Sequence, residues 1–299
     1  MISKMNKGIL KKRLNPITLL VLIMVLVISV TFLGYIFASH SWNKQYDSML
    51  TKCISPIEEQ YAKCIGNSLL SFANQNPTKI GEFQDYVYKN ANKKEPIDLR
   101  YFSDYSHYVG MNLADKPVSL NQAATFCGNS FLGGCLHGFV MENLDTKNVT
   151  GNKLTSFISF CSPLQNMTFQ YLNCLHGVGH EFWAKGLTSL NKDLGYCNGL
   201  SGPEYKNACW SGIFMEYSKS GKSNGHHLHT KVGVISIPCE QLSAIYQGTC
   251  YAAEGSYRQY YPNQEPQATT DKYCKSIPKN YTQVCLDGIN TRMNIEIGK

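Results

Sequence analysis

The stretch Cys174-Leu175-His176-Gly177-Val178-Gly179-His180-Glu181 is the most complete copy of a pattern that recurs along the chain. Each copy has a Cys, a variable residue at +2, usually Gly at +3 and often Glu at +7. Other copies begin at Cys135, Cys209 and Cys285, a weaker one begins at Cys250, and residues 104–113 resemble the pattern without its Cys. Because a period of about 35–40 residues is typical of stacked two-helix units, the pattern predicts an all-α helical-repeat fold.

The cysteine count predicts a disulfide framework. All twelve Cys lie beyond residue 52, and an even number favours six disulfides in an oxidising compartment over reduced thiols or structural metal sites. The spacing predicts the pairs Cys53–Cys64, Cys127–Cys135, Cys161–Cys174, Cys197–Cys209, Cys239–Cys250 and Cys274–Cys285. In each repeat the first Cys would end one helix and the second would begin the next, so that a bridge staples a helical hairpin.

The N-terminal region predicts a membrane anchor. Residues 17–37 form an uncharged run of 21 residues, long enough as a helix to span a bilayer core of about 30 Å. Five basic residues and no acid precede this run, which predicts a single-pass protein of the cell membrane with a cytoplasmic N-terminus and an extracytoplasmic C-terminal domain. A signal peptide cleaved near Ala38-Ser39 is the alternative. Sequons at Asn148, Asn166 and Asn280 are compatible with a glycoprotein.

These signals divide the chain into four parts. Residues 1–16 form a basic cytoplasmic tail, and 17–37 form the anchor. Residues 38–118 form a helical region with one Cys pair, and 119–299 form five disulfide-linked hairpin repeats, beginning at the capping-box pattern Ser119-Leu120-Asn121-Gln122. The net charge of +7 comes mostly from the tail, so the body of the chain is nearly neutral and does not predict nucleic-acid binding.

Stapled hairpins of this kind resemble the Sel1-like, tetratricopeptide-related repeats, especially the cysteine-rich Sel1-like proteins secreted by bacteria. Cys127 and Cys135, separated by seven residues, match the bridge spacing of that group, and Cys209 through Gly212 to Tyr217 is similar to its second helix. The resemblance covers about residues 119–290. It implies a helical solenoid that binds proteins or cell-wall material, and it carries over no site residue.

Histidines at positions +2 and +6 predict a metal site. These positions lie one turn apart on one helix face, and His176 and His180 occupy both of them in one copy. Stacked repeats would bring His137, at +2 of its own copy, close to this pair. The predicted ligands are His137, His176, His180, Glu181 and His107, with Glu142 and Glu216 supporting them from outside. Imidazole-rich sites of this kind suit one transition metal: Zn, Cu or Fe.

One alternative to this site stays open. The histidines could instead be packing residues that bond neighbouring helices, with the Glu residues as caps or ion-pair partners. A second metal-binding loop is predicted at His226, His227 and His229, and the alternative there is a polar loop with histidines present by chance. The chain has no CxxC, HExxH or CxxCH motif and no phosphate-binding glycine loop. These absences argue against zinc-ribbon, thioredoxin, zincin, c-type haem and P-loop functions.

The sequence supports two functional hypotheses. The first is a membrane-anchored extracytoplasmic repeat protein whose concave face binds a protein, a peptide or an envelope polymer. The second is a metal-binding protein or metal-dependent enzyme with a His/Glu site built from adjacent repeats. Whether the chain is an enzyme is left open by the sequence.

Overall fold

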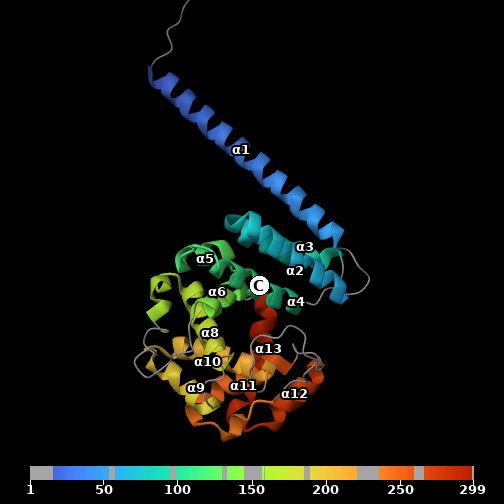
Figure 1. Ribbon diagram of the computed structural model, residues 1–299, viewed down its shortest axis with the longest axis vertical. Helices are drawn as coiled ribbons and strands as arrows, with labels where there is room; N and C mark the ends of the chain where they lie inside the picture. The colour runs from blue at the N-terminus through green and yellow to red at the C-terminus, as the bar shows by residue number, and fades with distance from the viewer. Residues whose placement is uncertain are drawn as a thin grey trace, which may run out of the picture. The chain divides into compact units, whose positions relative to one another are not determined.

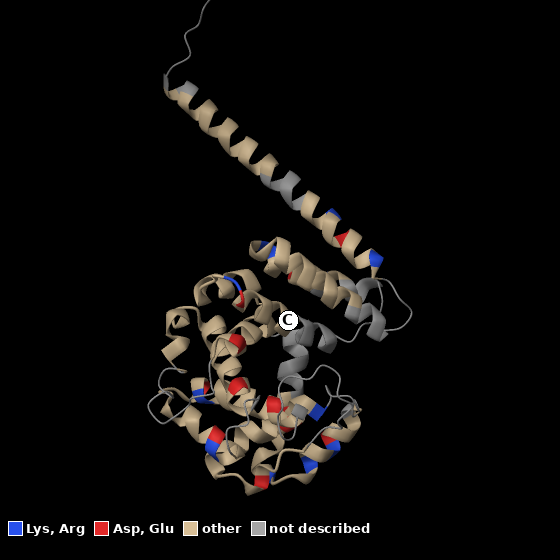
Figure 2. Ribbon diagram, in the orientation of Figure 1, with Lys and Arg blue, Asp and Glu red and all other residues tan. Residues whose placement is uncertain are grey.

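The computed structural model describes residues 16–53, 58–94, 99–129, 133–144, 157, 159–184, 189–220, 236–258 and 266–297 (Figure 1). All regular secondary structure in these ranges is helical, which confirms the predicted all-α class. The chain divides into two units, residues 1–48 and 49–299. Basic and acidic residues are interspersed along the described helices of the second unit (Figure 2).

The first unit holds most of helix α1 (Pro16–Lys52). Its described large apolar side chains between Ile17 and Leu33 are 51–69% exposed. The hydroxyl groups of Ser29 and Thr31 donate to the carbonyl oxygens of Val25 and Val27 one turn earlier, at 2.8 and 3.0 Å. Within the described residues, no helix combines the length and the apolarity that crossing a membrane requires. The anchor therefore stays a prediction.

The described residues of the second unit form a succession of helices and short helical turns. Its elements are α2 (Glu58–Gln75), η1 (Pro77–Lys79), α3 (Ile80–Lys94), α4 (Leu99–Ala114), α5 (Leu120–Cys127), α6 (Gly134–Asn143), η3 (Ser162–Leu164), α8 (Thr168–Ala184), α9 (Leu190–Tyr196), η4 (Cys197–Gly199), α10 (Pro203–Ser220), η5 (Cys239–Gln241), α11 (Ala244–Arg258), α12 (Gln267–Ser276) and α13 (Lys279–Ile297). The predicted capping box begins α5, where the Ser119 hydroxyl oxygen accepts from Gln122 N and the Gln122 side chain accepts from Ser119 N.

All six predicted disulfides are present, with Cα–Cα distances of 5.4 to 5.9 Å. Cys127 ends α5, Cys197 directly follows α9 and Cys274 lies in α12, so these bridges join two helices as expected. The expectation of a full first helix fails at Cys239, where the described residues before α11 form only the turn η5. There the bridge ties a turn to a helix, because Pro238 directly precedes the Cys and proline cannot donate to a helical hydrogen bond.

Helices α4 and α6 cross so closely that their backbones are in contact. A methyl group added at Gly110 would lie 1.8 Å from Cys135 O, and one added at Gly138 would lie 1.9 Å from His107 O. No side chain fits in that space, so glycine is required at both positions. Close approach of this kind allows Cα–H groups to contact carbonyl oxygens across the crossing.

The same reciprocal contact recurs at two further crossings. Between α8 and α10, methyl groups at Gly179 and Gly212 would meet Cys209 O and His176 O, each at 2.0 Å; between α11 and α13, those at Gly255 and Gly288 would meet Cys285 O and Ala252 O at 2.0 and 2.2 Å. The second helix of each pair uses its glycine at +3 from the Cys. The first helix of each pair contributes the glycine at +5 from its Cys. Helix α4 has no Cys, and Tyr105 occupies the corresponding position five residues before Gly110. The repeating unit is therefore a pair of crossed helices.

The +3 glycine approaches the neighbouring repeat rather than the first helix of its own hairpin. Gly138, Gly212 and Gly288 each contact the long helix of the neighbouring repeat. The physical reason is that the short first elements sit at the disulfide ends of the hairpins, which leaves the long helices to pack against one another.

Candidate metal centre

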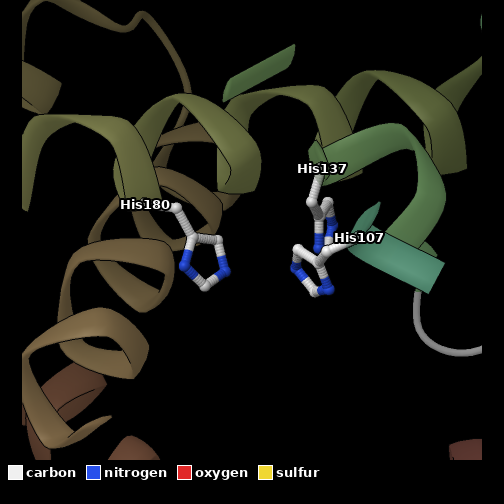
Figure 3. A group of neighbouring side chains, drawn as sticks. All are labelled: His107, His137 and His180. Atoms are coloured by element: carbon white, nitrogen blue, oxygen red, sulfur yellow. The ribbon is translucent and has the colours of Figure 1, made fainter. Parts of the chain in front are cut away.

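Three buried histidines meet from three different helices. His107 lies on α4, His137 on α6 and His180 on α8, with side chains exposed by 4% or less. Each offers a ring nitrogen, and these ligand atoms lie within 4.8 Å of one another. Figure 3 shows the rings of His107 and His137 side by side, facing that of His180. This group could hold a metal ion.

The glycine contacts explain why these rings converge. His107 and His137 both occupy the +2 position, and the α4–α6 crossing places the backbone of His107 directly against Gly138. On the other side of α6, a methyl group at Gly177 of α8 would lie 3.2 Å from the His137 Cα. Helices α4, α6 and α8 are therefore held at distances at which imidazoles of adjacent helices touch.

A carboxylate orients His180. Glu216 of α10 lies with its Oε2 3.0 Å from His180 Nδ1, and both side chains are almost fully buried. An ionised carboxylate only accepts hydrogen bonds, so Nδ1 carries the proton and Nε2 is the nitrogen with a lone pair. A carboxylate on the outer nitrogen of a ligand histidine is the usual support in metal sites.

An amide orients His137. The Asn173 Nδ2 donates to Phe169 O at 2.8 Å, which fixes its Oδ1 toward His137 Nε2 at 2.9 Å. The ring therefore donates from Nε2 and keeps its lone pair on Nδ1. Asn173 occupies the space beside Gly133, where an added methyl group would lie 2.3 Å from Oδ1. Gly133 also has φ +76°, a left-handed conformation that glycine adopts readily.

A hydroxyl orients His176, which lies beside the buried group. Ser211 donates its hydroxyl proton to Ala208 O at 2.9 Å, so its oxygen accepts from His176 Nδ1 at 2.7 Å. The His176 lone pair is therefore on Nε2. The ring centroid of His176 lies 4.7 Å from those of both His137 and His180.

The geometry fits a metal ion after a small inward movement of the rings. Nitrogen ligands with bonds of about 2.0–2.1 Å lie roughly 3.4 Å apart around a tetrahedral ion. The nitrogens here lie within 4.8 Å of one another, so rotation about the side-chain torsions must bring them closer. Neutral imidazoles are ligands for Zn, Cu and Fe.

The structure places the predicted site residues differently from one another. His107, His137 and His180 form the buried group, His176 lies next to it, and Glu216 supports it from outside as expected. Glu181 is buried, whereas the Glu142 side chain is exposed to solvent. The predicted loop ligands His226, His227 and His229 lie outside the described residues, as does Asn148.

Sequence reasoning missed Asn173 and the role of Ser211. No repeat pattern marks Asn173, because it contacts His137 only through the packing of α8 against α6. Ser211 occupies the same +2 position as His137 and His176, and this shared position could have indicated that it lies close to them. His107 was among the predicted ligands, and Gly110 three residues later gives it the same register as His176.

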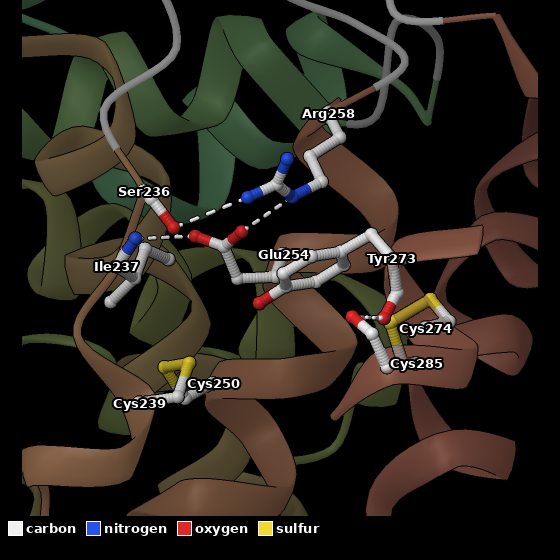
Figure 4. Close-up of polar contacts among 10 residues, drawn as sticks. Ser236, Ile237, Cys239, Cys250, Glu254, Arg258, Tyr273, Cys274 and Cys285 are labelled. Atoms are coloured by element: carbon white, nitrogen blue, oxygen red, sulfur yellow. Dashed lines mark hydrogen bonds and ion pairs between the residues drawn. A yellow bond between two sulfur atoms is a disulfide. The ribbon is translucent and has the colours of Figure 1, made fainter. Parts of the chain in front are cut away.

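A second buried polar group lies in α11 and α12 (Figure 4). The Glu254 carboxylate accepts from Ile237 N and from Arg258 Nε, the latter at 2.8 Å. The Arg258 guanidinium lies 3.7 Å from the centre of the Tyr273 ring. Burial raises the pKa of Glu254, against the opposing effects of the Ile237 N–H and Arg258, and burial and the nearby Glu254 raise the pKa of Tyr273. Its donors and acceptors are paired with one another, which indicates a structural role.

Comparisons with known proteins add no identification. No protein-family model matches the chain, and neither the curated proteins nor the solved structures give a significant match.

Proposed function

We propose that this chain is an extracytoplasmic metal-binding protein with a centre formed by His107, His137 and His180. The observation that carries the proposal is the convergence of three buried imidazoles from three helices, with ligand atoms within 4.8 Å of one another. An ion bound there ties α4, α6 and α8 together. Three protein ligands leave a fourth position of a tetrahedral ion for water or another ligand.

The hydrogen bonds around the rings resemble those that support ligand histidines in metal sites. Asn173 and Glu216 each accept from the outer nitrogen of one ring, which leaves a lone pair on the other nitrogen of His137 and of His180. A divalent ion also compensates the charge of the buried Glu216 carboxylate.

Elemental analysis of the purified chain tests this proposal. We expect about one Zn, Cu or Fe ion per chain, which persists through dialysis and is lost to a strong chelator. His137→Ala and His180→Ala should abolish stoichiometric binding. The triple variant His226→Ala, His227→Ala, His229→Ala is the control, and it should keep the ion. Wild-type protein that remains metal-free after loading with each of the three metals would overturn the proposal.

We also propose that α1 attaches the protein to the membrane. Support comes from the uncharged run 17–37, the basic residues before it and the exposed apolar side chains between Ile17 and Leu33. Full-length protein should stay in the membrane fraction after alkaline carbonate extraction, and a chain lacking residues 1–40 should be soluble. Recovery of full-length protein in the soluble fraction would contradict the anchor. A mature N-terminus at Ser39 would instead identify a cleaved signal peptide.

The hypothesis of a binding module stays a prediction. A stack of helices does not by itself select a protein, a peptide or an envelope polymer, because function resides in sites rather than in folds. The same holds for the resemblance to Sel1-like repeats.

A further inference from the structure

The packing of α6 against α8 joins the first pair of crossed helices, α4 and α6, to the second pair, α8 and α10, and is here called the first junction. A methyl group added at Gly177 of α8 would lie 3.2 Å from the His137 Cα and the Val140 Cβ, against 1.8–2.0 Å from carbonyl oxygens at the crossings within the two pairs. Each of the six disulfides joins consecutive cysteines, so none crosses this junction. The two pairs are therefore held to each other more loosely than the helices inside each pair.

Two neutral hydrogen bonds are described across the first junction. His137 Nε2 donates to Asn173 Oδ1 at 2.9 Å, and Gln170 Nε2 donates to Asn129 Oδ1 at 3.0 Å in an exposed position. The net contribution of a neutral hydrogen bond to stability is modest. Because the stability of a repeat stack depends on the interface between each pair of neighbours, a bond added at this interface has a large effect on how the pairs move.

The three converging histidines are divided between the two pairs. His107 and His137 belong to the first pair, whereas His180 belongs to the second, where Glu216 of α10 holds it at 3.0 Å. An ion bound by all three therefore links one pair to the other. Ligand nitrogens lie roughly 3.4 Å apart around a tetrahedral ion, and the nitrogens here lie within 4.8 Å of one another. Binding therefore favours the arrangement in which the two pairs are closest.

The second junction, where α10 packs against α11, has serine at two of the three ligand positions. In the register of the repeat, Ser211 of α10 takes the place of His137, and Ser256 of α11 takes the place of His180. The Tyr257 hydroxyl donates to Ser211 O at 3.3 Å, which places α11 beside this position. The ligand set is therefore specific to the first junction, and the second junction is an internal control.

We propose that the bound ion is a reversible cross-link between the first and the second crossed pair, so that metal availability determines whether the two pairs move as one body. This inference rests on the proposed metal-binding function and adds a regulatory role to it. Without the ion, the first junction opens and closes as a hinge, while each pair stays intact at its glycine crossing. With the ion, opening requires a coordination bond to break, so binding stabilises the closed junction.

Hydrogen exchange of the purified full-length chain, followed by mass spectrometry with and without Zn²⁺, tests the proposal. With free Zn²⁺ at 100 times its dissociation constant, exchange in peptides of α4, α6 and α8 should slow by up to about 100-fold. Peptides of α11 and α13 should change by less than about twofold, because their opening leaves the site intact. His180→Ala should remove the protection of α8 by Zn²⁺. Ser256→Ala, at the equivalent position of the second junction, is the matched control and should keep that protection.

The outcomes separate this inference from the proposed function. A wild type that binds none of Zn, Cu and Fe overturns both. One bound ion that protects every helix equally, or that protects α4 and α6 but not α8, overturns the cross-link alone. One bound ion without any change in exchange does the same. Circular dichroism of the metal-free variants shows whether their helices are intact; if His180→Ala unfolds, His180→Gln replaces it.

Discussion

Glu216 Oε2 lies 3.0 Å from His180 Nδ1, and both side chains are buried where α8 packs against α10. This contact links the buried histidines to the second pair of crossed helices. It determines which nitrogen of His180 is available to an ion, because the carboxylate can only accept. A residue of α10, separated from the helix of His107 by α6 and α8, therefore takes part in building the candidate centre.

Glu216→Gln should lower metal affinity by about 10–100-fold, the usual effect of losing an outer partner of a ligand histidine. The amide keeps an acceptor for His180 but removes the negative charge. Competition with a chelator of known affinity measures the change. Glu142→Gln is the matched control, because Glu142 occupies the same +7 position on α6 but is exposed. Equal losses in the two variants would contradict the assigned role of Glu216.

Gly212→Ala should destabilise the protein by about 1–3 kcal/mol or more, as expected when extra atoms are forced into a packed core. The added methyl group would lie 2.0 Å from His176 O, so α8 and α10 would have to separate. Gly248→Ala is the control. Gly248 lies inside α11 with no atom within 4 Å of the added carbon, so this variant should be more stable by roughly 0.5–1 kcal/mol. Chemical denaturation of the oxidised protein measures both, and destabilisation of similar size in the two would disprove the close crossing.

Removing a disulfide should destabilise the fold without changing the other bridges. The double variant Cys127→Ala, Cys135→Ala should lose about 2–4 kcal/mol of unfolding free energy, since the bridge no longer restricts the unfolded chain. Mass mapping of the unreduced variant should still recover the other five pairs, each between cysteines that are consecutive in the chain. Peptides cross-linked between different repeats would show that the hairpins do not fold as separate stapled units.

The buried Glu254 should make stability depend on pH. Burial raises the pKa of Glu254 in the folded protein, so the folded state holds a proton that the unfolded chain has already released. Its contribution to stability is present below the ordinary pKa of a glutamate and is lost as pH rises through the raised value. Unfolding free energies of the wild type and of Glu254→Gln, measured from acid to neutral pH, should differ in slope in that direction. A wild type that gains stability over the variant as pH rises would refute this.

Much of the framework was predictable because it depends on spacing along the chain. Paired cysteines separated by 8 to 13 positions form a bridge as soon as two short elements turn back on each other. The capping box at Ser119 is equally local. The sequence did not predict which helices form crossed pairs. At each crossing the +3 glycine of one helix and the +5 glycine of the other make equivalent contacts, so the glycine positions within one helix do not identify its partner.

The stretch from Cys174 to Glu181 shows where the boundary lies. The local pattern was sufficient to predict that Cys174 is bridged, that the segment is helical and that His176 and His180 share a helix face, since each depends on residues a few positions away. The packing of the helices was needed to show that His180 joins the buried group while His176 lies at its rim, and that His107 takes the third place. The reason is that the crossings bring α4, α6 and α8 together at glycines, and the distance between helices, not the spacing within one, determines which imidazoles meet.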